Sequence, residues 1–249
     1  MMKRLIAATL VLSVAVLPSV STAQVGPTLE EANAAPVEET EVPVGPRLFQ
    51  PVNFNVQEDL ENILVLDLSN GQRVSIRLMP SWAPEHVKRV KELTRQGFYD
   101  GVIFHRVIDG FMAQTGDPTG TGQGGSDLPD LKQEFNPLPH VRGTVSMARA
   151  QSDDSANSQF FIVFYPRLGL DRKYTNFGRV IAGMPGADVI ERGEPPANPT
   201  RILQASLAVD GKAPPVIAAP QPEETITLEM LNNAAAQQAP APPVPAPAE

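Results

Sequence analysis

Short apolar runs separated by Gly, Pro and Asn dominate the middle of the chain, and the first two of them predict a β-hairpin. The runs 63–68 and 74–78 flank the sequence SNGQ at 69–72. Asn-Gly between two strand-like runs is a strong hairpin signal, because both residues tolerate positive φ. We therefore expect the folded region to open with a two-stranded unit.

One amphipathic helix is predicted after this hairpin. Pro84 stands where a first helical turn tolerates a missing N–H. Apolar residues follow at helical spacing, and Gly97 provides a stop; these apolar residues are Val87, Val90 and Leu93. A second, shorter helix is expected near 187–192.

Six further apolar runs predict the remaining strands. They lie at 102–107, 111–114, 144–149, 159–164, 177–181 and 202–209. Many strands with only two helices favour a closed barrel. The predicted fold class is therefore mainly β, a closed eight-stranded antiparallel barrel capped by two helices.

The start of the chain has the three parts of a secretory signal. Two basic residues, Lys3 and Arg4, precede an uncharged apolar run over 5–17, and small residues follow up to Ala23. The run is shorter than the roughly 20 residues that span a bilayer. We expect residues 1–23 to be a cleaved signal peptide, the protein to be exported to the periplasm, and no integral membrane segment to remain.

Two flanks differ in composition from the expected domain at 52–212. Residues 24–51 are acidic and contain Pro, which predicts a flexible linker. Residues 213–249 are rich in Pro and Ala and lack aromatic residues, which predicts a disordered tail. The apolar group at 227–231 is either one docking turn or a chance cluster, and the composition favours chance.

Charge and cysteine content exclude several function classes. The net charge is -8 and falls mostly in the flanks, so the central region has no positive field with which to bind nucleic acid. The chain has no cysteine, which excludes disulfides, a thiol nucleophile and cysteine-ligated metal.

The densest group of motif residues is the stretch YDGVIFHRVIDGFMAQTGD at 99–117. It closely resembles the signature of cyclophilins, and so do SMAR at 146–149 and NSQFFI at 157–162. Leu170-Asp171 before Phe177-Gly178 extends the resemblance, which covers most of residues 55–210. The resemblance implies a single-domain eight-stranded barrel whose substrate groove lies on an outer face, and peptidyl-prolyl cis-trans isomerase activity.

Matching positions carry the family's roles onto this chain. Arg106 is implied as the catalytic arginine. The pocket for the proline ring is implied for Phe111, Met112, Phe161 and Leu170, and contacts with the peptide backbone are implied for Gln114, Ala148 and Gln159. Arg149 and Tyr174 stand where Asn and His are usual, and both are counted among the substrate-binding residues. Gly169 replaces a usual Trp, which argues against tight cyclosporin binding.

These residue types suit the reaction. Rotation about an X–Pro bond breaks no covalent bond, but it must cross a barrier of roughly 18–20 kcal/mol. As the bond twists, the proline nitrogen regains a lone pair, to which an arginine can donate a hydrogen bond. The chemistry needs no proton transfer, metal or cofactor, so no cofactor is expected.

Other interpretations of the same residues are less specific. Strand alternation assigns Phe160 to the core and Phe161 to the groove, and His105 is expected to be structural. The glycines at 116–125 lack the ending of a nucleotide-binding loop and are expected to shape the groove rim. The pairs Asp109 with Asp117 and Asp153 with Asp154 are interpreted as solvated turn carboxylates.

The sequence therefore predicts a monomeric isomerase that acts on proline-containing polypeptides during the folding of exported proteins. One alternative is a periplasmic holdase that binds such chains with little or no turnover. Another is an envelope-associated interaction protein in which the flanks are the active part. A peptide isomerisation assay distinguishes the first two, and deletion of the flanks tests the third.

Overall fold

The computed structural model describes residues 51–216. The predicted signal peptide 1–23, the linker up to residue 50 and the tail from residue 217 lie outside the described residues. The order of elements is η1 (Leu60–Asn62), β1 (Ile63–Leu68), β2 (Arg73–Leu78), α2 (Pro84–Arg95), β3 (Arg106–Ile108), β4 (Met112–Thr115), β5 (Thr144–Met147), β6 (Phe160–Val163), η2 (Leu168–Leu170), β7 (Asn176–Ala182), α3 (Met184–Asp188), β8 (Ile202–Leu207) and η3 (Ala208–Asp210).

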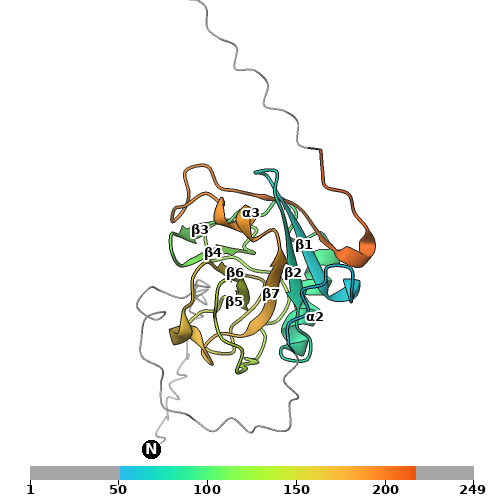
Figure 1. Ribbon diagram of the computed structural model, residues 1–249. Coiled ribbons are helices and arrows are strands. Elements are labelled where there is room, and N and C mark those ends of the chain that lie inside the picture. Colours follow the sequence, from blue (N-terminus) through green and yellow to red (C-terminus); the bar gives the residue numbers. More distant parts are fainter. Residues whose placement is uncertain (1–50, 217–249) are drawn as a thin grey trace, which may run out of the picture. The chain divides into compact units, whose positions relative to one another are not determined.

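All eight strands form one antiparallel sheet in the order β3-β4-β6-β5-β7-β2-β1-β8, which curls around the core (Figure 1). The predicted closure of the barrel is wrong, because no ladder within residues 51–216 joins β3 to β8. The residues just before β3 meet the start of β8 through an isolated bridge between Ile103 and Arg201 and through backbone hydrogen bonds of Gly101, Val102 and Phe104 with Ile202 and Thr200. The free edge of β3 pairs with Gly193 through Val107. The sheet is therefore a half-barrel.

Most predicted elements are confirmed, with shifted ends. The hairpin is present, since the Leu68 N–H donates to the Gln72 carbonyl at 2.8 Å. Strand β3 starts at Arg106, later than predicted, because its ladder with β4 begins there, while residues 101–104 hydrogen-bond to residues 200–202 instead. Helix α3 starts earlier than the predicted 187–192, with Pro185 in its first turn.

Helix α2 buries the three predicted residues Val87, Val90 and Leu93 in the core. Among the described residues, no helix combines the length and the apolar character that crossing a bilayer requires.

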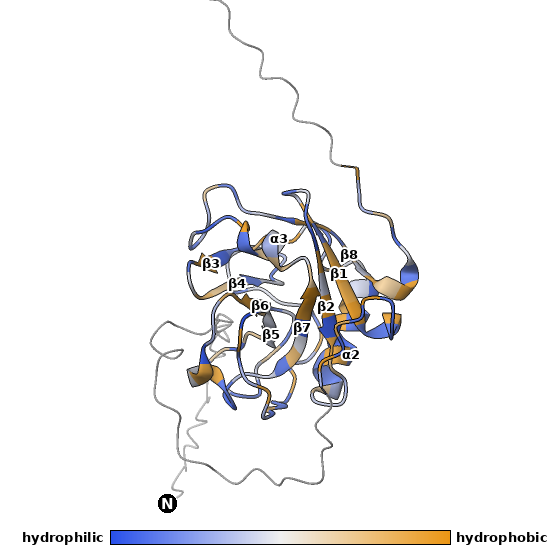
Figure 2. Ribbon diagram, viewed as in Figure 1, coloured by the Kyte–Doolittle hydropathy of each residue, from blue (hydrophilic) through white to orange (hydrophobic). Residues whose placement is uncertain are grey.

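The main core lies on the inner face of the sheet. Alternate residues of β6 and its continuation, namely Phe160, Ile162 and Phe164, belong to this core, as the alternation predicts for Phe160. Phe161 and Val163 belong to a second cluster on the other face. Figure 2 shows the apolar residues concentrated on the strands and the polar ones along the loops.

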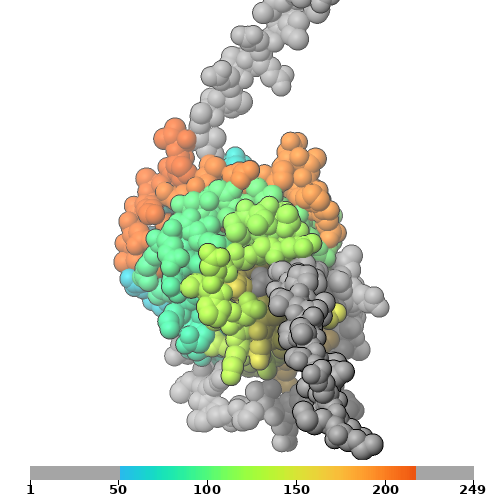
Figure 3. Space-filling model, turned by 180° about the vertical axis from the view of Figure 1, so that it is seen from behind, coloured from blue at the N-terminus to red at the C-terminus, as the bar shows by residue number. Residues whose placement is uncertain are grey.

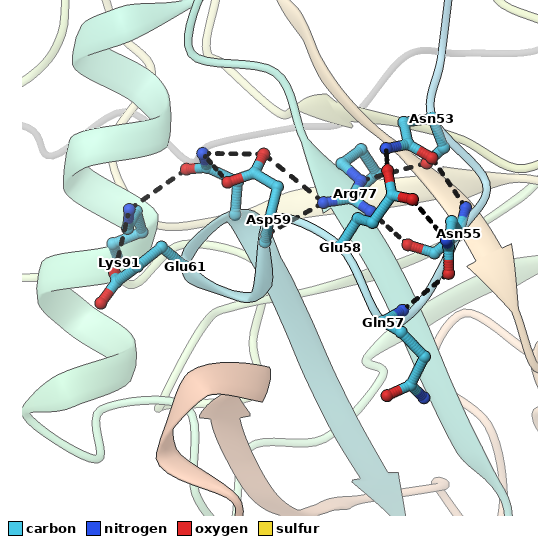
Figure 4. A network of polar contacts seen from close by, with 9 residues as sticks. Asn53, Asn55, Gln57, Glu58, Asp59, Glu61, Arg77 and Lys91 are labelled. Carbon is cyan, nitrogen blue, oxygen red and sulfur yellow. Dashed lines mark hydrogen bonds and ion pairs between the residues drawn. The ribbon is translucent and has the colours of Figure 1, made fainter.

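A polar network ties the segment before β1 to β2 (Figure 4). The buried Arg77 guanidinium donates to the carbonyls of Asn53 at 3.1 Å, Asn55 at 2.7 Å and Asp59 at 2.9 Å. Side chains of Asn53 and Asn55 donate to Glu58 and lower the pKa of its carboxyl. The domain therefore includes residues ahead of the first strand.

Candidate active site

Four strands align Arg106 with two of the predicted substrate-binding residues in one row across the sheet. Arg106 of β3 pairs with Gln114 of β4, Gln114 pairs with Phe161 of β6, and Phe161 pairs with Ser146 of β5. Directly opposed residues of antiparallel strands project from the same face of a sheet. The sequence positions 106, 114 and 161, far apart along the chain, therefore share one face. We call them, with Ser146, the outer row.

An apolar cluster occupies the same face. It consists of Phe111, Met112, Ala148, Phe161, Val163, Leu170 and Tyr174, all buried, with Ile108 packed against it. We call it the outer apolar cluster. Phe161 and Tyr174 meet edge to face, with ring centroids 5.7 Å apart. The structure thus brings together every residue that was predicted to line the proline pocket.

Arg106 lies at the edge of this arrangement. Ile108, two residues along the same strand, packs against the outer apolar cluster, and the side chain of Arg106 leaves β3 on the same face. Its Nε donates a hydrogen bond of 2.7 Å to Oε2 of Glu194. The Arg106 side chain is 17% exposed and that of Glu194 is 51% exposed.

Gln114 and Gln159 form a connected pair beside this arginine. Gln114 Nε2 donates to Gln159 Oε1 at 2.8 Å. Gln159 Nε2 in turn donates to the carbonyls of Gly122 at 3.1 Å and Gly124 at 2.7 Å. Within residues 51–216, the buried Gln114 Oε1 accepts no hydrogen bond. Gln114 thus has an acceptor available at the site, whereas the amide of Gln159 is bound to the glycine-rich loop.

The carboxylate of Asp117 fixes that loop from inside, so the interpretation of Asp117 as a solvated turn residue is wrong. Its side chain is buried and accepts hydrogen bonds from the backbone N–H groups of Thr119 at 2.7 Å, Gly122 at 2.6 Å and Gly124 at 3.2 Å. A Cβ at Gly124 would lie 2.2 Å from Asp117 Oδ1, so only glycine fits there. Figure 3 shows the connection between β4 and β5, in light green, over a large part of the face seen from behind.

Hydrogen bonding sets the ionisation of this aspartate. Burial alone raises the pKa of the Asp117 carboxyl, but the hydrogen bonds from Thr119, Gly124 and Gly122 outweigh burial and hold the pKa below its ordinary value. The nearby His105 ring is also buried. Burial lowers the pKa of His105, with a smaller opposing effect from the Asp117 carboxylate, which is consistent with a structural, neutral imidazole.

Arg149 packs against Tyr174 of the outer apolar cluster. Its guanidinium lies 4.7 Å from the centroid of the Tyr174 ring. It donates to the carbonyls of Lys173 at 3.2 Å and Ala150 at 2.9 Å, and it forms an ion pair with Asp153 at 3.2 Å. The charge of Arg149 is therefore already compensated within the chain, and Asp153 is an ion-pair partner.

The sequence did not predict a buried polar relay behind Phe161. Ser146 Oγ lies 2.8 Å from His140 Nε2, and His140 Nδ1 lies 2.8 Å from Asp171 Oδ1. The imidazole stacks on Phe161 at an interplanar angle of 20°. Ser146 and His140 are fully buried, so the relay supports the ring and is not accessible as a nucleophile. Asp171 lay in a quoted motif, but no local pattern indicated its partner.

Within the described range 51–216, no group of three or more His, Asp or Glu residues has an arrangement that could hold a metal ion.

Comparisons with known proteins match this geometry. A family model described as cyclophilin type peptidyl-prolyl cis-trans isomerase/CLD matches residues 63–207. The chain is 45% identical over 170 residues to a probable peptidyl-prolyl cis-trans isomerase of Brucella suis biovar 1, covering 62% of this chain and 86% of that relative. It is 41% identical over 128 residues to peptidyl-prolyl cis-trans isomerase B of Bacillus subtilis, covering 51% of this chain and 89% of that relative.

Solved structures give the same picture. A cyclophilin from Hirschia baltica superposes with a TM-score of 0.56 at 29% identity, covering 67% of this chain and 84% of that chain. A Cryptosporidium parvum cyclophilin type isomerase, solved in the presence of the dipeptide Ala-Pro, superposes with a TM-score of 0.55 at 30% identity, covering 58% of this chain and 98% of that chain.

Proposed function

Because the chain belongs to the family of cyclophilin-type peptidyl-prolyl cis-trans isomerases, we propose that it accelerates rotation of X–Pro bonds in exported polypeptides as they fold, with Arg106 as its catalytic residue. The isomerase activity follows from the family and from the curated relatives. The residues that carry the reaction and the cellular setting are the proposal.

The observation that carries the assignment is the outer row beside the outer apolar cluster. Arg106 shares a face and a register position with Gln114 and Phe161. A proline ring seated against Phe161 would place its imide nitrogen towards the arginine end of the row. The guanidinium, always protonated, then donates to the lone pair that appears as the bond twists.

Both Arg106 and the outer apolar cluster contribute to the rate acceleration. A hydrogen bond from a charged group contributes about 1.5–3 kcal/mol, and each tenfold in rate needs about 1.4 kcal/mol, so Arg106 accounts for roughly 10- to 100-fold. The outer apolar cluster supplies a further part by holding the ring while the peptide turns, and by excluding water that stabilises the planar amide.

Substrate contacts follow from the available polar atoms. Gln114 Oε1, buried and without a hydrogen bond among the described residues, suits a peptide N–H next to the proline. The relative solved with Ala-Pro supports proline-containing peptides as ligands. We propose that the protein acts on these peptides as a monomer.

The proposed setting is the periplasm, supported by the signal-like residues 1–23. If the protein is exported as proposed, sequencing of the amino terminus after expression in a Gram-negative host should start at Gln24, in the periplasmic fraction. A cytoplasmic protein that keeps Met1 or Met2 would contradict the export part of the proposal and leave the activity untouched.

The role of Arg106 is tested by Arg106→Ala in a protease-coupled proline-tetrapeptide assay. We expect kcat/KM to fall roughly 10- to 100-fold because the charged donor is lost, with an unchanged circular dichroism spectrum. Arg201→Ala, which removes an exposed arginine that precedes β8 and donates to the Gly101 carbonyl, serves as the matched control. Wild-type turnover in Arg106→Ala would refute the role. Peptide binding without turnover in the wild type would favour the holdase.

A further inference from the structure

We propose that Glu194 is a positioning residue for the isomerase reaction, which acts by fixing the guanidinium of Arg106. This inference rests on the proposed catalytic role of Arg106. Glu194 lies in the connection between α3 and β8, outside the motifs that carry the family resemblance. Its Oε2 accepts the Nε–H of Arg106 at 2.7 Å, a charge-assisted contact.

Backbone pairing places Glu194 beside Arg106. The N–H of Val107 donates to the Gly193 carbonyl at 2.8 Å, and the Gly193 N–H donates back to the Val107 carbonyl at 2.9 Å. The residues that follow Gly193 and precede Val107 are therefore neighbours along the free edge of β3. Gly193 has φ of 144°, and a Cβ there would lie 2.5 Å from Pro196 Cα, so this approach requires glycine.

The residue before Gly193 also anchors this segment. Arg192 forms an ion pair with Asp109 at 3.3 Å, and its guanidinium lies 4.4 Å from the centroid of the Phe164 ring. The segment that carries Glu194 is thus held at two points. The carboxylate meets Arg106 because of the fold, unlike a chance pair of flexible surface side chains.

A fixed guanidinium matters because this reaction depends on orientation. An arginine side chain is long and loses conformational freedom when it must face one lone pair. A carboxylate that accepts the Nε–H fixes the plane of the guanidinium before the substrate arrives, which is preorganisation of the donor. Glu194 itself has no atom to transfer and no bond to stabilise, so it acts through Arg106.

The expected effect is moderate. Glu194 is half exposed, and solvent screens one side of the pair. We therefore expect Glu194→Ala to lower kcat about fivefold to tenfold, with KM changed less than about twofold, because positioning is lost in the transition state more than in substrate binding. Glu194→Gln keeps an acceptor at the same place and should retain at least half of the wild-type kcat.

Asp109→Asn gives a matched control. It removes the other ion pair of the same segment without touching Arg106, so its kcat should equal that of the wild type. All three variants are made in the full chain, assayed with the same proline tetrapeptide, and compared in thermal unfolding to establish that they are folded.

The outcomes separate this inference from the proposed function. A Glu194→Ala enzyme as fast as the wild type, or faster, overturns the inference, and a faster one would mean that the carboxylate competes with substrate for Arg106. An equal fall in Asp109→Asn also overturns it, because the segment as a whole would then be responsible. If Arg106→Ala keeps full activity, the proposed function fails first, whatever Glu194 does.

Discussion

Neighbouring residues of the strands β3, β4, β6 and β5 point to opposite faces of the sheet, and the two faces have different roles. The inner row, Val107, Ala113, Ile162 and Val145, is apolar throughout and lies in the main core. The outer row, Arg106, Gln114, Phe161 and Ser146, mixes charge, amide, ring and hydroxyl. The same backbone therefore supports stability on one side and candidate chemistry on the other.

Removing side chain from the inner row should give the largest effect on stability. Ile162 is fully buried in the main core, so Ile162→Ala leaves a cavity and should lower the free energy of unfolding by about 2–5 kcal/mol. Activity per folded molecule should stay within about twofold of wild type. Urea denaturation with parallel turnover measurements checks this. An Ile162→Ala variant that is as stable as the wild type but inactive would contradict the claim that the inner row serves stability and not activity.

Replacing the buried Asp117, which holds the glycine-rich loop, should have an intermediate effect on stability and should also weaken substrate binding. Asp117→Ala removes the acceptor for three backbone N–H groups and should cost about 1–3 kcal/mol of stability. Because Gly122 and Gly124 then no longer orient Gln159, KM should rise about threefold to tenfold.

Asp127→Ala is the control for that variant. Asp127 is exposed in the same connection, and its replacement should change stability by no more than about 0.5 kcal/mol. Equal behaviour of the two variants in urea denaturation and in KM would show that the buried carboxylate has no special role.

Acidic pH should lower the stability of the fold more than it lowers the rate of isomerisation. Burial raises the pKa of the Glu134 carboxyl, but hydrogen bonds from the His86 side chain and from the N–H groups of His86 and Glu85 outweigh it and hold the pKa below its ordinary 4.5. The stabilisation is therefore complete above pH 4.5 and is lost as the pH falls through the lowered value.

Replacing this carboxylate should flatten the acid dependence. Glu134→Gln should lose about 1 kcal/mol at neutral pH and show a smaller further loss in acid than the wild type. Thermal unfolding at several pH values measures both. Since isomerisation moves no proton, kcat should stay level between about pH 6 and pH 8 in both proteins. A kcat that titrates with pH in that range would contradict the proposed mechanism.

Local sequence patterns predicted the features that depend on residues close together in the chain, such as the faces of strands and the position of a helix. Strand alternation separated Phe160 from Phe161, and apolar spacing with Pro84 predicted α2. Met112 and Phe161 face the outer apolar cluster because alternate positions of β4 and β6 do, whereas Phe111 and Leu170 reach it from segments outside these strands.

Long-range contacts could not be predicted in this way. Arg106 and Glu194 are 88 residues apart, and Glu194 lies in a Gly- and Pro-containing stretch with no periodic pattern. The burial of Asp117 depends on the path of a loop with no regular structure, so its residue type alone suggested a turn. Closure of the barrel was overestimated because strand number does not fix the pairing of the edge strands, and Gly193 occupies part of the edge of β3.

The most direct test of the division between the faces compares Arg106→Ala with Ile162→Ala in one experiment that measures both kcat/KM and the free energy of unfolding. We predict that Arg106→Ala loses roughly 10- to 100-fold in kcat/KM with stability changed by less than about 0.5 kcal/mol, and that Ile162→Ala shows the reverse pattern. Full turnover in Arg106→Ala, or equal losses of activity and stability in both variants, would contradict the account.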